Sequence, residues 1–533
     1  MKRICVLLGG LVAVAFVAIG LARAGHSADP HSANMALVGN YKPSAPDPPY
    51  AGGTDTSFWG NLAIAGNLSP GGFRILDISN PTAPTLVSNF ICRGSQSDIT
   101  VWDDLVFVSI DGPRASPDCD ALAGSAWEGI RVVSIADPAN PVQIATVRTD
   151  CGSHTHTLVP DLANDRLLLY VLSYPLGDAT ATCSPQTHRK ISVVEVPLAN
   201  PAAASVIGTP SVGPAAIGCH DVTVLLEKKI AGAACISESQ VWDISNPEQP
   251  VILAHINNPA INIHHSTTFS WDGNTLVIGD ELGGAAVAPG CVFSTPNSPA
   301  GALWFYDVSD RTLPLVAGPP YHISYSDPGT VCSAHNFNTL PTRSDRDILA
   351  SSWYSGATTV VDFTNPAAPT EIGYYVPKTD TAANSWSTYW YRDYMYANNR
   401  NARGVDVFRL DDAAILADAV DVPHLNQSTM EPLPPPTAVT LRSLRSAATA
   451  KGVVVRWRTG SETALAGFNV YRVRANGSLA KLNRTLIRAH SSGKTRGHAY
   501  AFTARGGRAG TTYRLEAVGL DGTKTRLGTT TAH

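Results

Sequence analysis

Histidines stand at the beginning of several strand-like runs, each beside another polar residue. His220 and Asp221 open one run in the stretch CHDVTVLLEKKIAGAAC. Equivalent pairs in other runs are Ser97-Asp98, Thr155-His156, His264-His265 and His335-Asn336. Neutral imidazole and carboxylate are the ligand types that suit zinc, copper, iron or manganese. The sequence therefore predicts a transition-metal site whose candidate ligands are His156, His220, His265, His335, Asp98, Asp221, Asp280 and Glu281.

Hairpin geometry indicates which of these side chains face one another. SWDGN offers Asp272-Gly273 as a two-residue turn of the kind that fits strand twist. Folding the chain about that turn sets His265 opposite Asp280 and His264 opposite Glu281. Two imidazoles would then lie against two carboxylates.

The same reasoning predicts a disulfide. Folding about residues 227–229 sets Cys219 opposite Cys235, close enough to bridge. That bond would clamp the open end of the hairpin that presents His220 and Asp221. A second pair, Cys291 with Cys332, would join an insertion to a later strand.

Other polar and aromatic residues are candidates for binding a small ligand, sugar or peptide. The aromatic residues near position 390 stand close to two arginines, although packing of the last repeat is the simpler interpretation. The polar pairs also have a structural interpretation, in which they only hydrogen-bond neighbouring strands and buried water. No GxSxG, HExxH or P-loop is present. The ligand-binding candidates are His154, His264, Asn336, Trp386, Tyr389, Arg400 and Arg403.

The runs that carry these pairs belong to a repeat that organises the first four hundred residues. One phrase returns seven times, from FRILDISNPTAP at 73–84 through TTVVDFTNPAAP at 358–369 to a shortened VDVFRL at 405–410. Each unit contains four strand-like runs, with a proline turn after the phrase. The pattern predicts an all-β fold, a seven-bladed β-propeller whose innermost strands line a central channel. The polar pairs then surround one mouth of that channel.

The phrase resembles the LVIVD-repeat family of bacterial and archaeal surface propellers over about residues 55–412. The segments SDITVWDD, SHTHTLVPD, CHDVTV and AHNFNTLP are similar to those of its larger, uncharacterised bacterial members. This resemblance implies the fold and export from the cell far more strongly than any activity. Histidines around a propeller mouth are also a feature of the methanethiol oxidase family, an analogy of architecture without a shared motif.

Changes in composition mark the ends of the repeat region. MKR, the apolar run ICVLLGGLVAVAFVAIGL and ARA predict a signal peptide over residues 1–24. Residues 25–54 are interpreted as an N-terminal extension, the propeller spans 55–412, and a proline-rich linker spans 413–437. The alternating runs beyond it are similar to fibronectin type III-like modules and predict a small β-sandwich over 438–533.

Charge and cysteine content restrict the partners. The 39 basic and 43 acidic residues give a formal net charge of −4. With no long basic run, this argues against nucleic acid. Eight cysteines follow the predicted signal peptide, an even number that suits disulfides in an oxidising compartment. We expect a secreted, periplasmic or cell-surface protein with no membrane span in the mature chain.

Three functions are compatible with these features. The first is an exported binding propeller whose histidine-rich mouth holds a metal ion or small ligand, with a small molecule, carbohydrate or surface protein as partner. The second is a metal-dependent enzyme, either a copper oxidase or a hydrolase that uses metal-activated water. The third is an adhesion module without metal. Metal analysis separates the first two from the third.

Overall fold

The computed structural model describes residues 29–43, 52–94, 96–115, 119, 127–175, 187–281, 301–325, 331–433, 439–462, 465–474, 478–491, 497–520 and 524–533. The predicted signal peptide, residues 1–24, lies outside the described residues. The chain divides into two compact units, Met1–Pro432 and Leu433–His533. Nearly all regular structure is β-strand, and α1 (Ala413–Asp418) is the one α-helix of the described residues. Within the same residues, no helix is long and apolar enough to cross a membrane.

The described part of the first unit is built from seven sheets, each with four antiparallel strands at its centre. The first contains β2 (Gly53–Trp59), β3 (Leu62–Asn67), β4 (Gly72–Asp77) and β5 (Thr85–Ile91). The second contains β6 (Gln96–Trp102), β7 (Leu105–Ala115), β8 (Trp127–Ser134) and β9 (Val142–Arg148). The third contains β10 (Thr155–Asp161), β11 (Arg166–Leu172), β12 (Ser192–Pro197) and β13 (Ser205–Gly208). The fourth contains β14 (Asp221–Leu225), β15 (Ile230–Ala234), β16 (Ser239–Asp243) and β17 (Val251–Ile256).

The other three sheets follow the same plan. The fifth contains β18 (His264–Phe269), β19 (Thr275–Asp280), β20 (Leu303–Asp307) and β21 (Leu315–Val316). The sixth contains β22 (Phe337–Thr339), β23 (Ile348–Ser352), β24 (Thr358–Asp362) and β25 (Thr370–Tyr375). The seventh contains β26 (Ser385–Tyr391), β27 (Tyr394–Asn399), β28 (Val405–Leu410) and β1 (Met35–Tyr41). Short 3₁₀ turns, η1 (Leu162–Asn164) and η2 (Pro201–Ala203), lie in the third sheet's connections.

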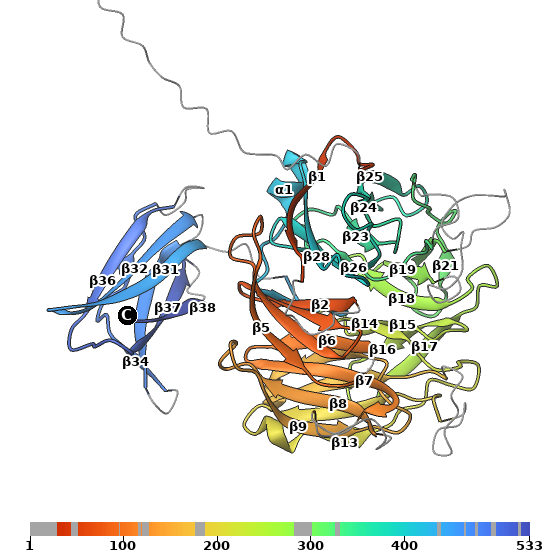
Figure 1. The fold of residues 1–533 in the computed structure, drawn as a ribbon, viewed down its shortest axis with the longest axis horizontal. Helices are drawn as coiled ribbons and strands as arrows, with labels where there is room; N and C mark the ends of the chain where they lie inside the picture. Colours follow the sequence, from red (N-terminus) through yellow and green to blue (C-terminus); the bar gives the residue numbers. More distant parts are fainter. Residues whose placement is uncertain are drawn as a thin grey trace, which may run out of the picture. The chain divides into compact units, whose positions relative to one another are not determined.

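The first strands of these sheets contact one another in a closed order. β2 contacts β6, and the contacts continue through β10, β14, β18 and β22 to β26, which contacts β2 again. The remaining strands of each sheet follow outward, as β6, β7, β8 and β9 do in Figure 1. Four-stranded antiparallel sheets in such an order are the architecture of a β-propeller.

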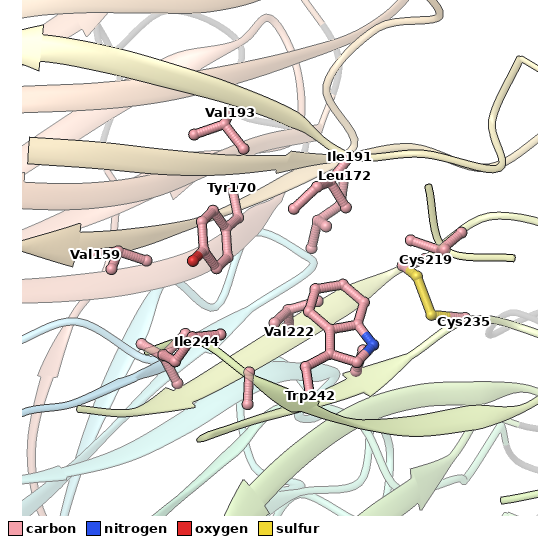
Figure 2. Packing of buried hydrophobic residues seen from close by; sticks show 14 of the residues in the cluster. Val159, Tyr170, Leu172, Ile191, Val193, Cys219, Val222, Cys235, Trp242 and Ile244 are labelled. Atoms are coloured by element: carbon pink, nitrogen blue, oxygen red, sulfur yellow. A yellow bond between two sulfur atoms is a disulfide. The ribbon is translucent and has the colours of Figure 1, made fainter. Parts of the chain in front are cut away.

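The repeated phrase explains how neighbouring sheets hold together. Alternate residues of a strand face opposite sides, so each phrase supplies two cores. In FRILD, Ile75 packs with Val106 of the next sheet, and Leu76 packs with Val407 of the preceding one. Figure 2 shows an equivalent core between the third and fourth sheets, where Tyr170 and Trp242 are buried.

The N-terminal strand completes the last sheet. β1 pairs antiparallel with β28, from Met35 opposite Leu410 to Tyr41 opposite Val405. Met35, Phe408 and Leu410 are buried in one cluster. This strand lies in the segment 25–54 that the sequence analysis set apart as an extension.

Two short strands after α1 return the chain to the innermost strands. β29 (His424–Leu425) pairs antiparallel with β2, and β30 (Thr429–Met430) pairs parallel with β14. Between them, the buried Asn426 amide accepts a hydrogen bond from Val101 N–H at 2.7 Å and donates one to the Val101 carbonyl at 2.9 Å. Part of the predicted linker, 413–437, is therefore built into the first unit.

The second unit consists of two sheets that share one core. One contains β31 (Thr440–Thr449), β32 (Gly452–Ser461) and β36 (Ala499–Ala504). The other contains β33 (Leu465–Val473), β34 (Leu479–Lys481), β35 (Ile487–Arg488), β37 (Thr512–Gly519) and β38 (Lys524–Thr531). Trp457 and Tyr500 from the first sheet pack with Phe468 and Leu515 from the second. Packing of two antiparallel sheets in this way forms a β-sandwich.

Candidate metal centre

Four imidazole rings from four consecutive sheets lie in a row near the beginnings of the innermost strands. They belong to His154, His220, His265 and His335, and all four side chains are buried. Neighbouring ring centroids are 4.4 Å apart for the first pair, 3.7 Å for the second and 4.3 Å for the third. Equivalent positions in successive sheets therefore bring together side chains that are far apart in the sequence.

Two overlapping groups in this row could hold a metal ion. His220, Asp221 and His265 form one group, and His265, Glu281 and His335 form the other, with ligand atoms within 4.8 Å of one another in each. His265 belongs to both groups and is fully buried. Neither of its ring nitrogens has a hydrogen-bond partner. A buried polar atom without a partner costs free energy, and a bound metal ion removes that cost.

Hydrogen bonds at one end of the row fix the proton on His335. Nδ1 of His335 donates to the backbone carbonyl of Trp386, which can only accept. The other nitrogen, Nε2, therefore carries a lone pair. It lies 3.7 Å from Oε1 of Glu281, another electron-rich atom.

The other end of the row is arranged in the same way. Nδ1 of His154 donates to Oδ2 of Asp111 at 2.7 Å, so Nε2 of His154 accepts a hydrogen bond from Nε2 of His220 at 2.8 Å. The amide nitrogen of Gln96, 3.0 Å away, is a second donor to the same atom. Nδ1 of His220 is left with a lone pair, 3.2 Å from Oδ2 of Asp221 and without a hydrogen bond. These two atoms repel when Asp221 is ionised, and a metal ion bound to both, or a proton on the carboxyl group, removes that repulsion.

Burial keeps the imidazoles neutral and the carboxyl groups easy to protonate. It lowers the pKa of His220, His265 and His335 well below the usual range. It raises the pKa of Asp221 and of Glu281 to about 7. The Glu281 carboxylate also accepts a hydrogen bond from the Tyr354 hydroxyl at 2.5 Å. Neutral imidazole is the form that binds metal ions.

Three other predicted residues lie outside both groups. His156 has both ring nitrogens hydrogen-bonded, to Thr100 and Ser109 at 2.7 Å each, and burial lowers its pKa to about 3. His264 contacts the Ser239 hydroxyl through Nδ1 at 2.8 Å, and its buried Nε2 has no hydrogen-bond partner. Arg403 forms a buried ion pair with Asp406 at 2.6 Å. The contacts of His156 and Arg403 are those of structural side chains.

The expected register of the fifth sheet is wrong by one position at the site. The pairing of β18 with β19 shifts between His264 and Ser266, so that His264 lies opposite Asp280 and His265 has no partner across the pair. Asp280 accepts hydrogen bonds from the backbone N–H groups of residues 262, 263 and 301 instead of supporting His265. Glu281 takes that place, with Oε2 at 3.5 Å from Nε2 of His265.

An internal pocket lies beside the row. Burial raises the pKa of its Asp55 to about 6, although that carboxylate accepts hydrogen bonds from Asn336, Tyr389 and Trp386. Asp98 accepts from the His156 N–H at 2.8 Å and from the Gln427 amide at 2.7 Å. The lining residues are Asp55, Asp98, Asp221, Ser266, Thr267, Asn336, Phe337, Tyr389, Gln427 and Ser428.

Asp55 was not among the residues predicted from the sequence, although a signal for it exists. Asp55 stands four residues before Trp59, as Asp98 stands four residues before Trp102. Both aspartates lie where the register of an innermost strand shifts, in β2 and in β6. The predicted residue Trp386 lies against the His335 ring, with centroids 4.7 Å apart, and Arg400 lies 5.5 Å from the Trp386 ring.

A disulfide joins Cys219 and Cys235, the pair indicated by the hairpin register. Figure 2 shows this bond beside the buried side chains of Trp242 and Val222. Cys219 directly precedes His220 in the sequence. Cys332 is also disulfide-bonded, and its expected partner Cys291 lies outside the described residues. A further bond joins Cys92 and Cys119.

Comparisons with known proteins identify one segment. Residues 68–91, which contain β4 and β5, match the LVIVD repeat. No curated protein matches the chain. The repeat match agrees with the four-stranded sheets in supporting a repeat-built β-propeller.

Three solved structures have a distant likeness. A hypothetical selenium-binding protein from Sulfolobus tokodaii is 11% identical with a TM-score of 0.40, over 61% of this chain and 76% of that chain. A protein from Lactobacillus plantarum is 14% identical with a TM-score of 0.37, over 74% of this chain and 99% of that chain. Hydrazine synthase from Kuenenia stuttgartiensis is 13% identical with a TM-score of 0.36, over 57% of this chain and 80% of that chain. At such TM-scores none of them decides the fold or the function of this chain.

Proposed function

We propose that this chain is an exported β-propeller protein that binds a transition-metal ion in its histidine row. The observation that carries the proposal is His265, a fully buried imidazole with two unpartnered nitrogens between the Asp221 and Glu281 carboxylates. Buried His156, by contrast, has both ring nitrogens hydrogen-bonded. Imidazole with carboxylate selects zinc, copper, iron or manganese over calcium or magnesium.

The proposed architecture is a seven-bladed propeller with a fibronectin type III-like module after it. Seven sheets in a closed order of contacts support the first part, and the two-sheet unit after Pro432 supports the second. The Cys92–Cys119 and Cys219–Cys235 disulfides, together with the disulfide-bonded Cys151 and Cys332, support an oxidising compartment, in which disulfides persist. Export, a surface location and the signal peptide over 1–24 belong to the same proposal.

Metal analysis of the purified protein tests the central claim. We expect stoichiometric zinc, copper, iron or manganese in the wild-type protein and its loss in His265→Ala. His264→Asn is the matched control, because that neighbouring histidine contacts Ser239 and belongs to neither metal group. A wild-type protein that neither contains nor takes up these metals would instead favour the metal-free adhesion module.

A metal-dependent enzyme is the second candidate function. It is favoured by Asp221, which belongs to one metal group and also lines the internal pocket. The pocket has room for about one water molecule, which would lie beside a Lewis acid and three buried carboxyl groups, those of Asp55, Asp98 and Asp221. Oxygen uptake by the copper-loaded protein and ester hydrolysis by the zinc-loaded protein test it, each against His265→Ala. Equal rates in the wild-type and variant proteins would rule this activity out.

A further inference from the structure

His265 presents its two ring nitrogens to two different sets of ligands. Nδ1 lies 4.0 Å from Oδ2 of Asp221, the carboxylate that Nδ1 of His220 approaches to 3.2 Å. Nε2 lies 3.5 Å from Oε2 of Glu281, the carboxylate that Nε2 of His335 approaches to 3.7 Å. Each side therefore offers two imidazole nitrogens and one carboxylate.

One metal ion cannot use both sides. The lone pairs of Nδ1 and Nε2 lie in the ring plane and point away from each other, so an ion bound to one nitrogen is out of reach of the other. An ion on the Glu281 side would leave the lone pair of His220 Nδ1 facing Asp221 without a cation. An ion on the Asp221 side would leave the corresponding conflict between His335 and Glu281.

We propose that the row holds two transition-metal ions, bridged by the His265 ring as an imidazolate. One ion is bound by His220, Asp221 and Nδ1 of His265, and the other by Nε2 of His265, Glu281 and His335. This inference rests on the proposed metal-binding function and adds a second ion and a shared ligand to it.

The proton balance of the bridge is simple. A neutral imidazole carries one N–H, and binding of metal at both nitrogens releases that proton to solvent. The imidazolate and the two carboxylates then supply three negative charges against the four positive charges of two divalent ions. Nearby Asp55 and Asp98 interact electrostatically with Asp221, but burial raises the pKa of both carboxyl groups, which favours their neutral forms. Two divalent ions, one imidazolate and two carboxylates therefore leave a net charge of +1 at the centre.

The outer contacts of the row suit this arrangement. His154 and Asp111 orient His220, and the Trp386 carbonyl orients His335, so that each terminal ring directs a lone pair inward. Such partners fix tautomers around metal ions. Hydrogen bonds therefore fix which ring nitrogen carries the proton in His154, His220 and His335. His265 is the one ring of the row in which no hydrogen bond does so.

Copper loading combined with electron paramagnetic resonance tests the bridge. Apo protein is titrated with Cu²⁺ alone, and bound copper and spin intensity are measured on the same samples. We expect two coppers per chain that are absent from His265→Ala, with the resonance intensity per copper falling at least fivefold at saturation. The fall is expected because spins couple antiferromagnetically through a bridging imidazolate.

Half-site variants supply the controls. Asp221→Asn and His335→Ala are each expected to retain one copper with its full resonance intensity, because each variant removes ligands on one side only. Glu281→Gln repeats the second test should His335→Ala fail to fold by circular dichroism. Saturation at one copper with full intensity would overturn the bridge and leave the proposed function intact. Two coppers with uncoupled spins would also overturn it, and no bound metal would overturn both proposals.

Discussion

The carboxylate of Asp111 sets the proton position on His220 through a third residue, His154. It accepts a hydrogen bond from Nδ1 of His154 at 2.7 Å, and the other nitrogen of that ring lies 2.8 Å from Nε2 of His220. The free lone pair on Nδ1 of His220 thus depends on the Asp111 carboxylate, which acts through the His154 ring.

We therefore expect Asp111→Asn to weaken metal binding by about 10- to 100-fold. The new amide can donate to His154 Nδ1, which reverses the chain of hydrogen bonds and places a proton on the metal-facing nitrogen of His220. The measurement is the zinc dissociation constant by competition with a chromophoric chelator. Glu238→Gln is the control, because Glu238 contacts His255 at 2.9 Å outside the row. Equal zinc affinity in Asp111→Asn and the wild-type protein would contradict the tautomer assignment.

Metal affinity should fall as pH falls through about 7. Burial raises the pKa of Asp221 and Glu281 to about 7, so protons compete with metal for both carboxylates near neutral pH. The pKa of each proposed imidazole ligand is lowered, so the imidazoles stay neutral in this range. Isothermal titration with zinc between about pH 6 and pH 8 measures the slope. Glu281→Gln should reduce the change in zinc affinity with pH. A zinc affinity that changes only below about pH 5 would show that groups other than Asp221 and Glu281 cause the pH dependence.

The Cys219–Cys235 bond should stabilise both the fold and the metal centre. It closes a loop with a sequence separation of 16, for which loss of the bond costs about 3 kcal/mol of unfolding free energy. Because Cys219 precedes His220, we expect the Cys219→Ala, Cys235→Ala protein to bind zinc more weakly as well as to unfold more easily. Cys92→Ala, Cys119→Ala should lower stability without this loss of affinity. Denaturant unfolding and zinc titration on both proteins separate the two effects.

Asn426 should contribute to the stability of the first unit. Its amide makes two hydrogen bonds with Val101 and is 2% exposed, so Asn426→Ala leaves two buried backbone groups without partners. The expected loss is about 2 kcal/mol of unfolding free energy. Asn401→Ala, whose amide donates to Ala382 at an exposed position, should change the free energy far less. Similar losses in the two variants would show that the hydrogen bonds between Asn426 and Val101 do not add to stability.

Strand alternation and the repeated phrase were enough to predict the all-β fold and the proximity of His220, His265 and His335, but they placed His156 with these residues instead of His154. They could not predict which member of each polar pair faces the others. The register shifts around Asp55, Asp98 and His265, and a bulge inserts a residue that turns the following side chains to the opposite face. A prediction from simple strand alternation includes no inserted residue. For that reason it placed Asp280 beside His265, where the structure has Glu281.

Two other features had no local signal. His156 and His335 look alike in the sequence, each at the beginning of an innermost strand. The first is satisfied by hydroxyl groups of the neighbouring sheet, and the second faces a carboxylate. Asp111 is 43 residues from the histidine that it orients, so only the fold connects the two.

The pairing of β1 with β28 also determines the order in which the first unit can form. The strand synthesised first has its partner among the last strands of the unit, so neither can be protected until the intervening sheets exist. Contacts between residues so distant in sequence form slowly, because the chain entropy of closing the loop must be lost before the pairing is gained. In the meantime both strands expose unpaired backbone groups. A chain that stalls at this stage presents two complementary edges, each able to pair with the matching edge of a second copy and exchange strands with it.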